Sequence, residues 1–60
     1  MSPLAQTIVD ELRATPRQFS EVVDQHRNIP WPEFLKAWGE IRGLVTIGRD
    51  ESGRYLLKDG

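Results

Sequence analysis

The sequence contains no cysteine, which excludes disulfide bonds and thiolate metal ligands as sources of stability. A cysteine-free composition fits a reducing compartment, so we expect a cytoplasmic protein. No apolar run approaches the roughly 20 residues of a transmembrane helix, and no signal-peptide pattern opens the chain, so we expect no membrane partner. The one histidine has no second histidine or cysteine beside which it could bind a metal, and we expect neither a metal nor another cofactor.

An excess of charge of one sign is also missing. Eight Lys and Arg residues against nine Asp and Glu residues give a net charge of −1, without the basic excess typical of a nucleic-acid-binding domain.

The sequence also lacks a set of residues that could form a catalytic site. Ser20 and His26 lie on one short predicted helix and cannot face each other as nucleophile and base. The glycines do not form a phosphate-binding fingerprint. We therefore expect that the protein is not an enzyme.

The chain has enough apolar residues for one small core. Its 60 residues predict a single domain, residues 1–60, which is either a whole protein or a piece of a longer one. A domain of this size buries only about 60% of its unfolded surface, so it needs most of its apolar side chains inside. The 38% hydrophobic content, with two Trp, two Phe and one Tyr, meets that need.

The clearest predicted element is an amphipathic helix near the start of the chain. Ser2 suits the N-cap and Pro3 the first turn. The apolar residues that follow share one helical face, namely Leu4, Ala5, Ile8, Val9 and Leu12. The helix should end near Ala14, because the residue before Pro16 disfavours helical backbone.

Two interpretations are open for the residues that follow. Thr15 to Gln18 could form a capping box that begins a long second helix. Alternatively, residues 17–19 form a short extended strand, and Ser20 caps a short helix that runs to about His26. We favour the second interpretation, with Phe19 as the apolar residue just before the cap. Residues 27–30 then form a turn, since Asn and Pro both interrupt helices.

A third helix is predicted from about Pro32 to Arg42, followed by a β-hairpin. Phe34, Leu35, Trp38 and Ile41 should form its inward face, and Gly43 should end it in a left-handed conformation. The hairpin strands are expected at residues 44–48 and 54–58. Between them, residues 50–53 supply a turn, with Gly53 available for a positive φ.

Three segments together resemble the winged helix-turn-helix superfamily. They are Phe19–Val23 at the entry to the second helix, Phe34–Val45 from the third helix into the hairpin, and Gly53–Leu57 in the returning strand. The resemblance implies an α+β fold of three helices followed by a two-stranded wing, with an optional short strand at residues 17–19. One departure is Gly39, which stands where such domains usually place an apolar residue.

The resemblance implies binding of double-stranded DNA through the outer face of the third helix and the wing. Lys36 and Arg27 would then lie near the groove, with Arg49 and Arg54 at the phosphate backbone. The outer face predicted from the inward set carries Glu33, Lys36, Ala37 and Glu40. Its net negative charge opposes DNA binding, since affinity comes largely from phosphate contacts. Scattered, solvated surface charge is the alternative explanation of the arginines.

The second hypothesis is a protein-interaction module with the same fold and no DNA binding. Its candidate contacts are Trp31, Glu33, Ala37 and Glu40, and its partner is another protein or a second copy of the chain. Trp31 lies between two prolines, and tryptophan is enriched in interface hot spots. The alternative role for Trp31 is to pack over the turn and cover the core, which we favour in so small a domain. We rank DNA binding, as a transcriptional regulator or part of one, ahead of the interaction module.

Overall fold

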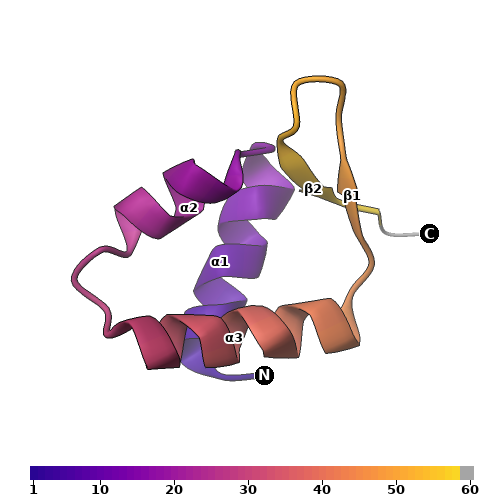
Figure 1. Ribbon diagram of the computed structural model, residues 1–60. Helices are drawn as coiled ribbons and strands as arrows, with labels where there is room; N and C mark the ends of the chain where they lie inside the picture. The colour runs from indigo at the N-terminus through magenta and orange to yellow at the C-terminus, as the bar shows by residue number, and fades with distance from the viewer. Residues whose placement is uncertain (59–60) are drawn as a thin grey trace.

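The computed structural model describes residues 1–58. Its elements are α1 (Pro3–Ala14), α2 (Phe19–Gln25), α3 (Trp31–Leu44), β1 (Ile47–Arg49) and β2 (Tyr55–Leu57). The two strands form an antiparallel hairpin after the three helices (Figure 1). The predicted α+β class, with three helices followed by a two-stranded hairpin, is therefore confirmed.

Helix α1 begins and ends where the sequence predicts. The Ser2 hydroxyl accepts a hydrogen bond from the backbone N–H of Ala5 at 3.2 Å, so Ser2 is the N-cap. Thr15 has extended backbone just after the last helical residue, as expected of a residue that precedes proline. The buried residues of α1 are Ala5, Ile8, Val9 and Leu12.

The start of α2 differs from the prediction. Ser20 is not the cap, because the helix already includes Phe19 and its N-cap is Gln18. The Glu21 carboxylate accepts the backbone N–H of Gln18 at 3.1 Å and so satisfies a donor that the helix leaves free. The expected short strand is reduced to one residue: Arg17 and Tyr55 exchange two backbone hydrogen bonds, of 3.0 and 2.6 Å.

The end of α3 also differs. Gly43 does not end the helix, which continues through Leu44 to a C-cap at Val45. Val45 is extended, with φ −130° and ψ 156°, a conformation that β-branched residues favour. Among the described residues, only Gly53 has a positive φ, of 81°, which confirms its predicted role in the hairpin turn. The strands are shorter than expected, partly because Leu44 belongs to α3.

The inward face of α3 is rotated relative to the prediction. Leu35 was expected inside, but 44% of its surface is exposed; Ala37 was expected outside, but only 3% of its surface is exposed. The buried set is Phe34, Ala37, Trp38 and Ile41. These positions follow the i, i+3, i+4, i+7 spacing of one helical face, which Leu35 does not. Ala37 therefore packs inside and is not available to a partner.

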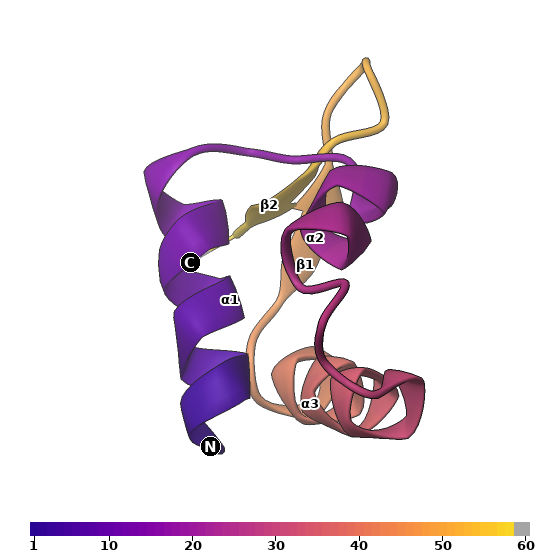
Figure 2. The ribbon, with the colours of Figure 1, turned by 90° about the vertical axis from the view of Figure 1, so that its left-hand side faces the viewer.

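An aromatic cluster joins the helices to the hairpin. The Phe19 ring lies 5.9 Å from Phe34, 5.1 Å from Trp38 and 6.2 Å from Tyr55, centroid to centroid, in edge-to-face arrangements. Helix α1 packs against both α3 and β2. Seen from the side, α1 stands opposite α2 and the hairpin, while α3 lies across one end of the molecule (Figure 2). This arrangement leaves the outward face of α3 uncovered by the rest of the described chain.

Candidate interaction surface

Four residues form a line along the outward side of α3. We call Trp31, Leu35, Gly39 and Arg42 the outer stripe. Their spacings of four, four and three residues place them on the same side of a helix. All four are exposed, and Trp31 and Leu35 keep 51% and 44% of their surface accessible. Two large apolar side chains thus stand in the first half of the stripe.

Trp31 packs on the core and is also half-exposed. Its ring stacks on that of Phe34, with centroids 5.5 Å apart and planes 7° from parallel. Because Phe34 is buried, one face of the indole covers the core. With half its surface exposed, Trp31 also presents apolar area to solvent. The stacking fixes its orientation, so little side-chain entropy remains to be lost if a partner covers it.

Two glycines lie in the second half of α3 with open space beside them. A Cβ added at Gly39 or Gly43 would meet no atom within 4 Å outside the local helix backbone. Glycine inside a helix costs roughly 0.5–1 kcal/mol relative to alanine. No contact within the described chain requires either glycine. Their effect is to leave this part of the helix without projecting side chains and therefore accessible.

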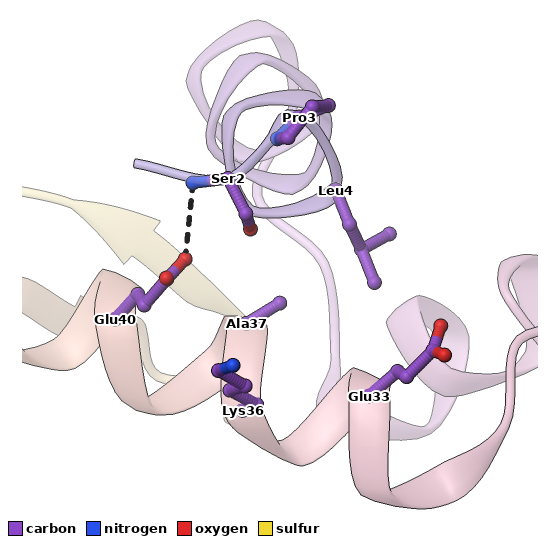
Figure 3. Close-up of a pocket in the computed structure, with 7 residues that line it drawn as sticks. All are labelled: Ser2, Pro3, Leu4, Glu33, Lys36, Ala37 and Glu40. Atoms are coloured by element: carbon purple, nitrogen blue, oxygen red, sulfur yellow. Dashed lines mark hydrogen bonds between the residues drawn. The ribbon is translucent and has the colours of Figure 1, made fainter.

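The opposite flank of α3 faces the start of α1 across a shallow hollow of about 240 Å³ (Figure 3). The backbone N–H of Ser2 donates to Glu40 Oε2 at 3.1 Å. Hydrogen bonds from the Ser2 side chain, and then from its backbone, lower the pKa of Glu40 below its ordinary value of 4.5. A carboxylate is also stabilised near a helix N-terminus. Glu40, a candidate partner contact, therefore has an internal role in holding α1 to α3.

Glu33 and Lys36 line the same hollow. Glu33 and Glu40 stand three residues before and four residues after Lys36, spacings at which helical side chains can form ion pairs. Among residues 1–58, neither pair comes within the 4.0 Å that defines an ion pair. Lys36 is exposed and acts on Glu40 only as a nearby positive charge. The local charge is nevertheless mixed, which is unfavourable for a groove lined with phosphates.

Two of the arginines that were predicted to contact DNA lie next to carboxylates of this chain. Arg54 Nε lies 3.1 Å from Asp50 Oδ2, and Arg27 Nη1 lies 3.7 Å from Asp24 Oδ1. The turn after α2, which carries Arg27, and the hairpin lie at opposite sides of the molecule (Figure 1). The predicted basic residues therefore do not form one continuous surface.

Arg49 instead lies beside Arg42, a residue that the sequence analysis did not select. Both line a hollow of about 350 Å³ between α3 and the hairpin, together with Trp38, Ile47, Gly48 and Tyr55. The Arg49 guanidinium lies 5.5 Å from the centre of the Tyr55 ring. Within residues 1–58, no carboxylate lines this hollow and neither arginine is in an ion pair. The sequence signal that points to Arg42 is its position four residues after Trp38, which places it next to Trp38 on the surface of the helix.

Two other kinds of site were searched for among the described residues. These residues contain no group of three or more His, Cys, Asp or Glu side chains that could hold a metal ion. None of the helices in residues 1–58 is both long enough and apolar enough to span a bilayer.

Comparison of the chain with protein-family models, with curated proteins and with solved structures found no match.

Proposed function

We propose that this chain is a protein-interaction module that binds its partner on the outward face of α3. The observation that supports the proposal is the outer stripe, in which Trp31 and Leu35 stand exposed ahead of the open surface at Gly39. Exposed aromatic and aliphatic side chains beside a low surface are typical of the anchors and pockets of protein interfaces. A cytoplasmic location, suggested by the cysteine-free composition, is part of the same proposal.

The α3 surface favours this proposal over DNA binding. A helix that reads the major groove presents hydrogen-bonding side chains to base edges. The outer stripe presents Trp31, Leu35 and Gly39 with one such side chain, Arg42, and the opposite flank carries Glu33 and Glu40. Burying Trp31 and Leu35 against another protein removes apolar area from water, whereas a phosphate-lined groove gives them no comparable gain.

Photocrosslinking in living cells tests the proposal. A photoreactive amino acid at Lys36, which is exposed on α3 one helical turn before Gly39 of the outer stripe, should give covalent adducts with a partner protein. The same amino acid at Glu51 is the matched control, because Glu51 is also exposed but lies in the hairpin turn, away from α3. Adducts that require Lys36 and disappear with Leu35→Glu would support the proposal. Absence of adducts at Lys36, or equal labelling at Glu51, would contradict it.

DNA binding is the second candidate, and one observation favours it. Arg42 and Arg49 line a hollow between α3 and the hairpin that has no carboxylate from residues 1–58, and the resemblance to winged helices puts the DNA backbone near the hairpin. An amide-shift titration with mixed-sequence duplex DNA, at low and at physiological salt, tests this candidate. Salt-sensitive shifts at both arginines, lost in the Arg42→Ala, Arg49→Ala double variant, would support it. No shifts at low salt would exclude it, since non-specific phosphate binding is strongest there.

A further inference from the structure

We infer that the partner of the outer stripe is a second copy of this chain, packed through α3 against α3 in an antiparallel arrangement. The inference rests on the proposed function and names its partner. It starts from the order of residues along the stripe. Within the stripe, the large apolar residues Trp31 and Leu35 lie in the first half of α3, whereas Gly39 and Arg42 lie in the second half.

Two copies of the stripe fit each other when the helices run antiparallel, because the large residues of one copy then face the glycine and the arginine of the other. In a two-fold symmetric interface, residue i of one copy meets residue j of the other, and residue j meets residue i. Trp31 and Arg42 are about 16 Å apart along the helix axis at 1.5 Å per residue. An antiparallel pair centred at the level of residue 37 therefore places Trp31 of each copy beside Arg42 of the other. Leu35 of each copy then meets Gly39 of the other.

The contact between Leu35 and Gly39 explains the open helix surface. Gly39 has no side chain, and the space where its Cβ would lie is empty within the chain. Leu35 is exposed and has room on the solvent side of α3. Small residues let two helices approach closely, so Leu35 of one copy can fill the space above Gly39 of the other. The cost of a glycine inside a helix is then offset by packing between copies.

The contact between Trp31 and Arg42 is electrostatically favourable. One face of the Trp31 ring is covered by Phe34, which leaves the other face open. Arg42 is exposed and, within residues 1–58, has no carboxylate partner. A guanidinium over an indole face forms a cation–π contact, for which tryptophan is the best aromatic partner. The stripe itself contains no acidic residue, so pairing two copies brings no like charges together at its centre.

The size of the contact predicts weak association. Helix α3 has 14 residues and is about 21 Å long at 1.5 Å per residue. A single pair of helices of this length falls in the small class of protein interfaces, which bury less than about 1,200 Å² in total. We therefore expect a dimer that dissociates on dilution, not a permanent one.

Sedimentation velocity of the full chain over a wide range of concentrations tests the inference. The mean mass should rise from monomer to dimer as concentration increases. Leu35→Glu should weaken association by at least about tenfold, since it replaces the apolar contact with a charge. Leu44→Glu is the matched control: Leu44 is 65% exposed and lies on α3 outside the stripe, so its substitution should leave association unchanged.

Two further variants test the geometry. Gly39→Leu should abolish association by filling the space that Leu35 needs, while the open surroundings of Gly39 let the monomer keep its fold and melting temperature. Arg42→Ala should weaken association in the antiparallel arrangement, because Trp31 of the other copy loses its contact. In a parallel arrangement the two Arg42 side chains would face each other, and the same substitution would strengthen association. Strengthening would therefore overturn the antiparallel arrangement.

The outcomes separate this inference from the proposed function. A chain that stays monomeric at every concentration overturns the inference. If crosslinking at Lys36 then captures a different protein in a Leu35-dependent way, the proposed function still stands. If the chain is monomeric and Lys36 gives no adduct, both fail. A dimer that persists in Leu35→Glu and Gly39→Leu uses another surface, and this too overturns the inference.

Discussion

His26 at the end of α2 is held to Glu11 of α1, with His26 Nε2 2.8 Å from Glu11 Oε1. Both side chains are largely buried, at 13% and 28% of their surface exposed. From the sequence alone, His26 is expected to be neither a metal ligand nor a catalytic base. The structure gives it a polar partner from a helix that is distant in sequence. This contact is the polar link between α1 and the end of α2.

Replacing His26 should destabilise the fold. His26→Ala removes the hydrogen bond and leaves the Glu11 carboxylate partly buried without it, so we expect a loss of about 1–3 kcal/mol. Chemical denaturation of the variant measures the change. Exposed Gln25, the preceding residue, provides the control, since Gln25→Ala should cost much less. Equal losses in the two variants would show that the contact with Glu11 contributes nothing.

Acid should weaken the structure through Asp50 and Glu40. The backbone N–H and the guanidinium of Arg54 hold the pKa of Asp50 below its ordinary value of 3.8, and Ser2 holds the pKa of Glu40 below 4.5. A carboxyl group with a lowered pKa in the folded state stabilises the fold above its unfolded pKa. That contribution is lost as pH falls through the folded pKa.

Stability measured against pH checks this expectation. Asp50→Asn and Glu40→Gln should each lower stability at neutral pH and flatten its decline below about pH 4.5, the range set by the ordinary carboxyl pKa values. Asp10→Asn, in an exposed position on α1, is the control and should leave the curve nearly unchanged. If stability falls as steeply with decreasing pH in both variants as in the unaltered protein, these two carboxylates are not the cause of the fall.

Two glycines should respond to alanine in opposite directions. Gly43 lies inside α3 with nothing near its Cβ position, so Gly43→Ala should stabilise the fold by roughly 0.5–1 kcal/mol. Gly53 has φ 81°, so Gly53→Ala should destabilise it by more than about 1 kcal/mol. Thermal melts of the two variants compare the signs directly. Destabilisation by Gly43→Ala would show that the backbone at residue 43 is not helical.

The rotated face of α3 predicts a strong contrast between neighbouring residues. Phe34 is fully buried and in contact with the rings of Phe19, His26 and Trp31, so Phe34→Ala should cost roughly 3–5 kcal/mol and could unfold so small a domain. Leu35→Ala removes an exposed side chain and should cost less than about 1 kcal/mol. Melting at low protein concentration, where any association is minimal, makes the comparison. Similar losses of stability in the two variants would show that Leu35 is buried in the core.

The sequence by itself determined the elements whose causes are local. The start of α1 depends on Ser2 and Pro3, and its end on the proline at position 16, so both were predictable. The positive φ at Gly53 follows from turn chemistry among a few neighbouring residues. The order of three helices and a hairpin follows from apolar periodicity and from the turns between the segments. None of these features needs a contact between distant parts of the chain.

Only the tertiary structure decided which side of α3 faces inward and which arginines are available. Leu35 was predicted on the inward face and Ala37 on the outer face, and the structure exchanges the two. The space next to α1 accommodates Ala37, which leaves Leu35 outside. The partners of Glu40, Arg17 and His26 are 15 to 38 residues away in sequence. Such pairs depend on how the helices pack against one another, which no local pattern encodes.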